Sequence, residues 1–494
     1  MSAKRPQRPQ PAKNLVGLVG YAPPKAPAPT DLLLDANEGP PPPPEFFRLF
    51  DRIDTDHVRR YIKAIELETV LADRFGVTPE QIMVGAGADE IIDRICRVYV
   101  QPDREVVVPT PTFEMICHFA RISGGKIQRV VWSGEEFPLA GVQDAASERT
   151  GMVVVVSPNN PTGFIVRPEE LAALAEAAPQ AIIMVDLAYA SFAEVDLLGT
   201  VLRYPNAVAV GTLSKGYGLA GLRLGFAIGD KEVVQLLRLT GGPYPVSSLS
   251  VAMATKWLVD GERQIAASIA RIREEREALL HLLAGLGVET LSGQGNFVFA
   301  RFADDLWVRD ALAGLGIAVR YVSATEGFAA GLRISCPGAA EDFERLCHAL
   351  VTVLSPEAIL FDMDGVPGST LIPDPEVLAR LGARMRLGVV TARSRTEAER
   401  FLEEQGVRRH FAMLVCREDA PLESAAAGMR LALQKSGIFR AWFVSETTDG
   451  IRAARGAHVL PIGFSTPAGA DDDSLYAAGA GRVGKSFAEI ERLL

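Results

Sequence analysis

The sequence predicts an α/β protein built on a mainly parallel β-sheet, followed by a second, smaller α/β unit. Three observations favour this class. Apolar runs typical of buried strands occur at 151–156, 181–185 and 207–210, and each leads into turn-forming or polar residues. Amphipathic helical patterns alternate with these runs. The length of 494 residues also exceeds that of one ordinary domain.

The order of these patterns indicates where domains begin and end. Residues 1–30 are basic and proline-rich, and we expect them to form a flexible arm. A large domain is expected over about 55–245, and a small domain from about 31–54 together with 250–354. The first strand–helix pattern ends near residue 354, so 355–494 is expected to form a separate domain.

Composition excludes some classes of partner. The formal net charge of -10 argues against a nucleic-acid-binding surface. No apolar run is long enough to span a membrane and no secretory signal pattern opens the chain, so we expect no membrane partner. The cysteines lack metal-ligand spacing, and their odd number favours the reducing cytoplasm. They are Cys96, Cys117, Cys336, Cys347 and Cys416.

The segment 211–226 (GTLSKGYGLAGLRLGF) is the strongest indication of chemistry in the chain. Lys215 follows a predicted strand in a glycine-rich turn, where its amine can form a Schiff base with the aldehyde of pyridoxal phosphate. Thr212, Ser214 and Arg223 are donor types that hold a phosphate. The other interpretation is a solvated lysine on a flexible loop, but ordinary surface lysines have charged neighbours that this one lacks.

Three earlier segments carry side chains that such a cofactor needs. Asp186 ends a predicted strand, and a carboxylate beside the pyridine nitrogen makes the ring a better electron sink. Asn160 and Tyr189 are neutral donors suited to the ring hydroxyl. The segment 85–90 (GAGADE) opens a helical pattern, whose free N–H groups favour a phosphate. The alternatives are a turn-capping role for Asp186 and a core position for Tyr189.

With these residues, the chain resembles the fold-type I pyridoxal-phosphate-dependent aminotransferases. Within them, it most resembles the histidinol-phosphate aminotransferase group. The resemblance covers about 31–354. It implies a large, mainly parallel-sheet cofactor domain, a small α/β domain and a homodimer. It also implies that Lys215 holds the cofactor and moves the proton in an amino-group transfer.

The resemblance assigns further roles residue by residue. Asp186 would pair with the pyridine nitrogen, Asn160 and Tyr189 would bond the ring oxygen, and Phe113 would stack on the ring unless it is a core aromatic. The implied cofactor-binding set is Ala88, Asp89, Phe113, Asn160, Asp186, Tyr189, Thr212, Ser214, Lys215, Arg223 and Tyr61, which would reach the phosphate bound in the neighbouring subunit.

The implied substrate-binding residues are Asn37, Arg320 and Arg333. Arg333 matches the arginine that grips the anionic end of the substrate, although a surface salt bridge is its alternative. Arg320 and Arg333 together could clamp a phosphate dianion, whereas Arg333 alone would serve a carboxylate equally well. We therefore expect amino-group transfer between an amino acid or amino-phosphate and a 2-oxo acid. The alternatives are an aminotransferase of another biosynthetic pathway, a decarboxylase or lyase with the same cofactor, or an assembly that holds it without turnover.

Three positions depart from the pattern of the aminotransferases. Tyr61 is followed by Ile62 and Lys63, where a proline and an acidic residue are usual. An acidic residue commonly follows the pyridine-pairing aspartate, but here it is Leu187. A basic residue often precedes the Thr-Leu-Ser-Lys run, but here it is Gly211. The first departure leaves the role of Tyr61 across subunits open, and the other two bear on the substrate.

The last unit opens with 358–366 (AILFDMDGV), an apolar strand that leads into Asp362 and Asp364. Carboxylates at a strand end can bind Mg²⁺, and the first can attack phosphorus while the second moves a proton. The stretch 358–494 resembles the haloacid dehalogenase (HAD) superfamily, with a Rossmann-like fold and little or no cap. It implies Asp362 as nucleophile, Asp364 as acid/base and Thr391 as a phosphate contact.

The rest of the HAD pattern is incomplete. The lysine that would offset negative charge is missing from 417–423, and Glu446 stands where an aspartate is usual. The implied Mg²⁺ ligands are Asp362, Asp364 and Glu446. We therefore expect a structural or ligand-sensing role in preference to phosphatase activity, with a bifunctional aminotransferase/phosphatase as the alternative.

Overall fold

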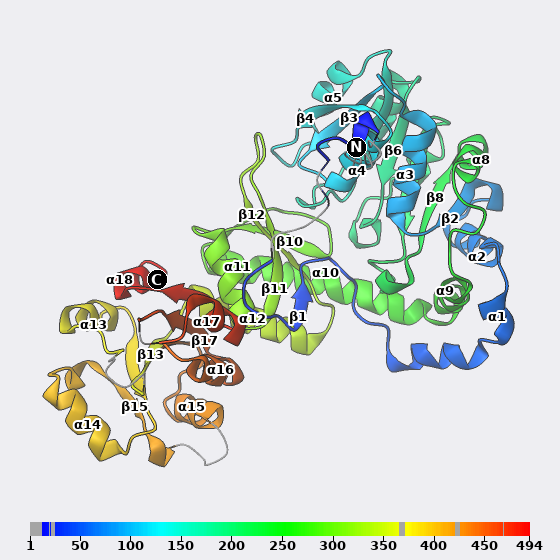
Figure 1. Cartoon of the computed structure of the whole chain (residues 1–494). Coiled ribbons are helices and arrows are strands. Elements are labelled where there is room, and N and C mark those ends of the chain that lie inside the picture. Colours follow the sequence, from blue (N-terminus) through cyan, green and yellow to red (C-terminus); the bar gives the residue numbers. More distant parts are fainter. Residues whose placement is uncertain (1–11, 19, 21–24, 365–370, 420–424, 468) are drawn as a thin grey trace, which may run out of the picture.

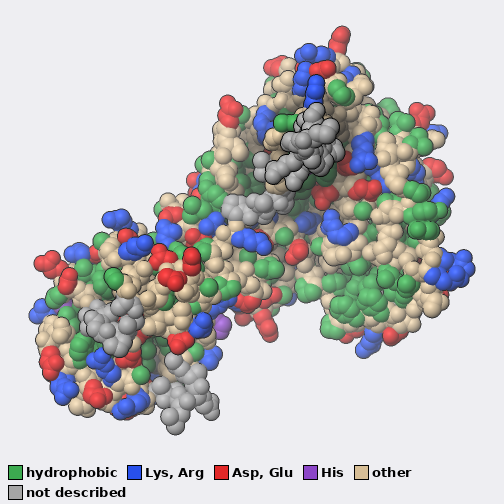
Figure 2. All heavy atoms as spheres, viewed as in Figure 1, with side chains coloured by type: hydrophobic (Ala, Val, Ile, Leu, Met, Phe, Trp, Pro, Cys, Tyr) green, Lys and Arg blue, Asp and Glu red, His purple; other side chains and the backbone are tan. Residues whose placement is uncertain are grey.

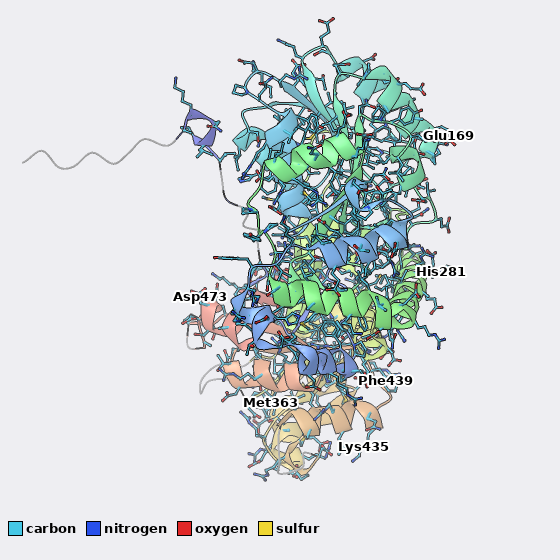
Figure 3. The ribbon with its side chains drawn as sticks, turned by 90° about the vertical axis from the view of Figure 1, so that its right-hand side faces the viewer. Glu169, His281, Met363, Lys435, Phe439 and Asp473 are labelled. Carbon is cyan, nitrogen blue, oxygen red and sulfur yellow. The ribbon has the colours of Figure 1, made fainter. Side chains whose placement is uncertain are left out.

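The computed structural model describes residues 12–18, 20, 25–364, 371–419, 425–467 and 469–494. Three β-sheets, each packed with helices, lie one after another along the molecule (Figure 1). The side view in Figure 3 shows the same stacking, with Glu169 in the first unit, His281 in the middle one and Lys435 in the last. The prediction of an α/β protein is confirmed.

The first sheet has seven strands in the order β2-β8-β7-β6-β5-β3-β4. Strand β8 runs antiparallel to its neighbours β2 and β7, and the other pairings are parallel, as the prediction of a mainly parallel sheet requires. Its strands are β2 (Ile82–Gly85), β3 (Glu105–Thr110), β4 (Lys126–Val131), β5 (Thr150–Val156), β6 (Ile182–Asp186), β7 (Ala207–Thr212) and β8 (Gly225–Gly229).

Helices cover both faces of this sheet, which explains the continuous apolar runs of its strands. Val106 and Val108 pack on one face with α3, α4 and α8, whereas Val107 packs on the other with α2, α6 and α9. The helices of this region are α1 (Thr55–Arg59), α2 (Ile65–Phe75), α3 (Ala88–Tyr99), α4 (Glu114–Ile122), α5 (Leu139–Ala145), α6 (Pro168–Ala177), α7 (Leu198–Val201), α8 (Lys231–Leu239) and α9 (Ser248–Asp260).

The second sheet joins two distant parts of the chain. Strand β1 (Leu32–Leu34) pairs in parallel with β11 (Ile317–Val322), so the residues that follow β1 reach the edge of the first sheet. The strand order is β1-β11-β12-β10-β9, where β9 is Glu289–Thr290, β10 is Phe297–Arg301 and β12 is Gly331–Ser335. Its helices are α10 (Glu262–Gly285), α11 (Asp305–Gly314) and α12 (Ala340–Leu354).

The third sheet is entirely parallel, with the order β15-β14-β13-β16-β17-β18. Its strands are β13 (Ala358–Asp362), β14 (Arg386–Val390), β15 (Met413–Val415), β16 (Ala441–Ser445), β17 (Leu460–Phe464) and β18 (Arg482–Gly484). Its helices are α13 (Pro375–Gly382), α14 (Arg395–Glu404), α15 (Ala425–Lys435), α16 (Thr448–Gly456), α17 (Asp472–Ala478) and α18 (Phe487–Glu491).

The third unit docks firmly on the second. Trp442 of β16 is fully buried, its ring lies 5.4 Å from that of Trp307 in α11, and its indole N–H donates to the Thr352 carbonyl oxygen at 2.8 Å. At the rim, Arg455 of α16 donates to the Pro29 carbonyl oxygen at 2.7 Å and pairs with Asp31. One continuous apolar core therefore serves both units.

The predicted N-terminal arm is described only in part, since residues 1–11, 19 and 21–24 lie outside the described residues. The described part is not detached. It forms a short 3-10 helix, η1 (Lys13–Leu15), beside α4, and Asn14 donates to the Ile122 carbonyl oxygen. Among the described residues, no helix is both long enough and apolar enough to cross a bilayer.

Candidate active site

A cavity of about 630 Å³ lies where the carboxyl ends of the first sheet face the second sheet. Ligands of α/β proteins commonly bind at this edge. Most of the residues predicted for the site line this cavity. They are Ala88, Asp89, Phe113, Asn160, Asp186, Tyr189, Thr212, Ser214, Lys215, Arg223, Arg320 and Arg333.

Lys215 lies in the turn after β7, and its Nζ donates to the Ala36 carbonyl oxygen at 2.9 Å. Burial, together with the nearby Arg333 guanidinium, lowers the pKa of this amine to about 8. A substantial fraction of the amine is therefore neutral near pH 8, which is the form that attacks a carbonyl carbon.

Asp186 is the last residue of β6 and is buried. Its carboxylate accepts a hydrogen bond from the Ala188 N–H at 2.9 Å, while desolvation raises its pKa to about 6. The carboxylate is therefore still ionised at neutral pH. A buried negative charge of this kind stabilises a cationic ring nitrogen placed beside it.

Donors for an anion gather around the N-terminus of α3. The Thr212 hydroxyl donates to Ser214 Oγ at 3.0 Å, and Arg223 lies opposite with its Nη2 3.4 Å from Asp89. Two glycines keep this cradle open. A Cβ on Gly87 would lie 2.7 Å from Arg223 Nη2, and one on Gly225 would collide with the backbone that starts α3. Free helix N–H groups, two hydroxyls and a guanidinium form a site suited to phosphate.

Tyr189 belongs both to the core and to the cavity wall. Its ring packs edge-on against Phe297 at 5.2 Å. Its hydroxyl accepts hydrogen bonds from the amides of Asn37 at 3.0 Å and Asn160 at 3.5 Å. The two interpretations of Tyr189, core aromatic and cavity donor, therefore describe different parts of the same side chain.

Asn37 departs from its predicted place. It is fully buried with φ of 53°, its Oδ1 accepts from the Ser335 hydroxyl at 2.7 Å, and it does not line the cavity. In this structure the Asn37 side chain lies behind Tyr189 and donates to its hydroxyl, so direct substrate contact by Asn37 stays a prediction. Its neighbour Glu38 lines the cavity instead.

Two arginines form the far wall of the cavity. Arg320 of β11 and Arg333 of β12 are direct partners in the antiparallel register. Arg333 donates to Asn160 Oδ1 at 2.7 Å and to the Asp35 carbonyl oxygen at 2.6 Å, so it is not a surface salt bridge. Two arginines at paired positions on one cavity wall favour an anionic ligand.

The comparison with known proteins agrees with this geometry. The sequence profile of the family Aminotransferase class I and II matches residues 34–350. The chain belongs to this aminotransferase family. Among its relatives, the histidinol-phosphate aminotransferase of Caldanaerobacter subterraneus is 34% identical over 331 residues, which cover 65% of this chain and 93% of that protein. The histidinol-phosphate aminotransferase of Xylella fastidiosa is 32% identical over 369 residues, or 72% of this chain and 96% of that protein.

A solved aminotransferase structure has the same fold as this part of the chain. The crystal structure of histidinol-phosphate aminotransferase from Sinorhizobium meliloti in complex with pyridoxal-5'-phosphate has a TM-score of 0.59 and 24% sequence identity. The match covers 65% of this chain and 90% of that one.

Tyr61 of the aminotransferase lies away from the cavity of its own chain. It is 83% exposed, and its ring stacks on that of Tyr244 at a centroid distance of 4.8 Å. Met115 and Glu38 also line the cavity and were not predicted for the site. Each lies within two residues of a predicted one, Phe113 and Asn37, and this closeness is the signal that could have found them.

The acidic residues of the third unit come together only in part. Asp362 accepts from the Ser445 hydroxyl at 2.7 Å, and burial raises its pKa. Asp364 accepts from the Thr391 hydroxyl at 2.6 Å and from the Ala392 N–H. These contacts place the residues predicted for HAD chemistry at neighbouring strand ends.

The predicted Mg²⁺ set does not form. Glu446 is fully buried and accepts from the Thr466 hydroxyl at 2.7 Å. Within the described ranges, no three Asp, Glu, His or Cys side chains are arranged to hold a metal ion. The structure therefore does not bring Asp362, Asp364 and Glu446 together as one metal-ligand group, and Mg²⁺ binding by this set stays a prediction.

Proposed function

We propose that the chain uses pyridoxal phosphate to transfer an amino group between a phosphorylated amine of the histidinol-phosphate type and a 2-oxo acid. The observation that carries this substrate class is the pairing of Arg320 and Arg333 on one wall of the cavity. A carboxylate needs one guanidinium, whereas a phosphate dianion is better matched by two. The names of the relatives support the same class.

The residues around Lys215 fit this cofactor. The cradle at α3 suits its phosphate, Asp186 suits its ring nitrogen, and Asn160 and Tyr189 suit its ring oxygen. When bound, pyridoxal phosphate supplies an electron sink for the carbon that loses its proton. Phe113 also lines the cavity and is the aromatic side chain that would stack on the ring.

The chain's own residues account for the remaining steps. The Lys215 amine, with its pKa lowered to about 8, would carry the proton from the substrate Cα to the cofactor in the first half of the reaction, and from the cofactor to the Cα of the acceptor in the second half. Arg333, fixed by Asn160 and Asp35, holds the anionic end of the substrate so that this Cα faces Lys215. Amino exchange is tested by mass analysis of the products with 2-oxoglutarate, since loss of CO₂ would instead identify a decarboxylase.

We also propose a division of the chain that follows the three sheets. Residues 1–30 form an N-terminal arm, and 31–354 form the aminotransferase, with a large domain over about 55–245 and a small domain from about 31–54 and 250–354. Residues 355–494 form the appended domain. A cytoplasmic location is supported by the five cysteines, which are all free thiols.

We propose that the aminotransferase is a homodimer. Exposed apolar side chains gather near α1, α9 and the 3-10 helix η2 (Pro44–Arg52), and Figure 2 shows hydrophobic atoms massed over this region. They include Phe47, Val58, Tyr61 and Val259, exposed by 60%, 74%, 83% and 58%. A second copy of the chain would cover this patch and would bring Tyr61 to a cavity other than its own.

Val58→Asp is expected to shift the protein from dimer to monomer, because a charge would be buried in the proposed interface. Light scattering coupled to size exclusion measures the mass directly. Phe439→Asp, at another exposed apolar position in the third unit, is the matched control and should leave the dimer intact. A dimer that survives Val58→Asp at low micromolar concentration contradicts the proposal.

We further propose that 355–494 is a HAD-like domain with a structural or ligand-sensing role. Its support is the six-stranded parallel sheet with Asp362, Asp364, Thr391 and Ser445 near the carboxyl ends of adjacent strands. The missing lysine and the absence of a metal-ligand group among the described residues argue against hydrolysis. Magnesium-dependent phosphate release that Asp362→Asn abolishes would instead support the bifunctional alternative.

Trp442→Ala is expected to lower the free energy of unfolding by about 3–5 kcal/mol, because it empties a buried site shared by two units. Thermal unfolding should show the small domain destabilised together with the third unit. Phe439→Ala removes an exposed aromatic from the same unit and should change stability little. An unchanged transition of the aminotransferase in Trp442→Ala would show that the third unit does not support it.

A further inference from the structure

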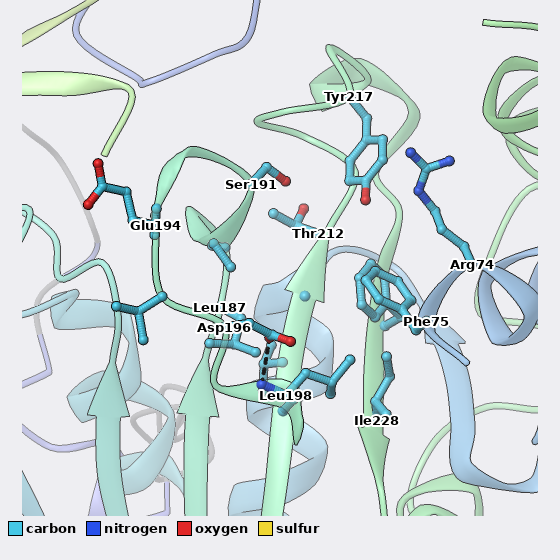
Figure 4. A pocket seen from close by; sticks show the side chains of 18 residues that line it. Arg74, Phe75, Leu187, Ser191, Glu194, Asp196, Leu198, Thr212, Tyr217 and Ile228 are labelled. Atoms are coloured by element: carbon cyan, nitrogen blue, oxygen red, sulfur yellow. Dashed lines mark hydrogen bonds between the residues drawn. The ribbon is translucent and has the colours of Figure 1, made fainter. Parts of the chain in front are cut away.

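A second cavity, of about 370 Å³, lies beside β7, the strand that leads into the turn with Lys215 (Figure 4). Its walls come from the end of α2, the loop after β6, and strands β7 and β8. The volume is in the range of small-molecule sites. None of the roles assigned above uses this cavity.

Its floor is apolar. Phe75, Leu187, Leu198, Phe226 and Ile228 line it, and the rings of Phe75 and Phe226 pack at 5.2 Å. The Phe226 ring lies so close to Gly211 that a Cβ there would collide with it. The missing side chain at Gly211 lets this ring fold onto the strand, which leaves the space in front of Leu187 open.

Its rim carries hydrogen-bond donors. Figure 4 shows the hydroxyl groups of Ser191 and Tyr217 directed toward the same space, with Arg74 beside the Tyr217 ring. The Arg74 guanidinium lies 5.5 Å from the centre of that ring. Its ion pair with Glu262 is long, at 3.9 Å, and Glu262 is 72% exposed. Within the described part of the chain, neither hydroxyl group is hydrogen-bonded to another residue.

Two acidic side chains also line the cavity but do not face these donors. Asp196 accepts from the Leu198 N–H at 2.8 Å, the contact drawn as a dashed line in Figure 4. Glu194 is exposed and its carboxylate points away from Ser191 and Tyr217 in that view. The rim near Tyr217 is therefore the cationic, donor-rich end of a largely apolar space.

We propose that this second cavity binds a small carboxylate with an aliphatic or aromatic body. The carboxylate accepts hydrogen bonds from Arg74, Ser191 and Tyr217, and the body packs on Leu187 and Phe226. Ala188 and Thr212 line both cavities, so the occupant lies against the back of the segment that ends at Lys215. The site is separate from the substrate site proposed above and does not depend on its assignment.

The test uses the whole cofactor-bound protein and 3-phenylpropionate, which has no amino group to exchange. Isothermal titration calorimetry should show one saturable binding event at millimolar concentration or below. Arg74→Gln should weaken it by about tenfold or more, because a charge-assisted contact is lost. Leu187→Trp, which fills the floor, should also abolish binding, whereas the visible absorption of the bound cofactor should remain in both variants.

Two controls separate this cavity from the substrate site. Arg97→Gln, on α3 outside both cavities, should bind the probe as the unaltered protein does. Arg333→Gln should also retain binding, because Arg333 lines only the first cavity. Binding lost in Arg333→Gln and retained in Arg74→Gln would place the probe in the substrate site and overturn the proposal. The absence of any binding heat in the unaltered protein would overturn it as well.

Discussion

Replacing Lys215 by Ala is expected to reduce amino-group transfer by at least about a thousandfold, because the amine is both the attachment point of the cofactor and the proton carrier. Its position supports both tasks. It lies in a cavity with Asp186 on one side and a phosphate-type cradle on the other, and its pKa is lowered to about 8. Turnover and the visible absorption of the bound cofactor should change together.

Lys231→Ala serves as the matched control for that experiment. Lys231 is exposed at the start of α8 and does not line the cavity, so its replacement should leave both turnover and absorption unchanged. Circular dichroism would establish that Lys215→Ala is folded. A folded Lys215→Ala protein that retains turnover would contradict the assigned role of Lys215.

The second large effect is expected at the paired arginines. Arg333→Gln should raise the KM for a phosphorylated amine by about a hundredfold, because hydrogen bonds from a charged group contribute roughly 1.5–3 kcal/mol each. Arg333 also anchors Asn160 and Asp35, so kcat should fall as well. Steady-state kinetics with the phosphorylated amine and its dephosphorylated counterpart measure both parameters.

Arg320→Gln tests how much the second guanidinium contributes to recognition of the substrate phosphate. Its expected signature is a fall in the preference for the phosphorylated amine over its dephosphorylated counterpart, with a smaller change in kcat. Arg203→Gln, at an exposed position outside the cavity, is the matched control. An unchanged preference in Arg320→Gln would show that a single guanidinium suffices, which would favour a carboxylate substrate.

Much of the first domain could be predicted because the informative residues lie at strand ends. The run 151–156 and the strand before Lys215 are continuous apolar segments buried on both faces. Such strands can be recognised from the local sequence alone, without knowledge of their tertiary contacts. Asp186 and Lys215 follow adjacent parallel strands, so their meeting at one edge follows from topology alone.

Side-chain directions in irregular segments could not be predicted in the same way. Asn37 adopts a positive φ that turns its amide toward Tyr189 and Ser335, whereas the backbone of Ala36 faces Lys215. The docking of Trp442 on Trp307 joins residues far apart in the chain, and no local pattern marks it. The contact between Glu446 and Thr466 likewise joins residues that are not neighbours in the chain, and no local pattern marks it.

Whether this aminotransferase takes a phosphorylated amine is best measured in a half-reaction. The cofactor-loaded protein is mixed with histidinol phosphate, histidinol, aspartate and an aromatic amino acid in turn, without a 2-oxo acid. The visible absorption of the bound cofactor is then followed. We expect a complete spectral change with histidinol phosphate and little change with histidinol. A response confined to the aromatic or acidic amino acid would contradict this expectation.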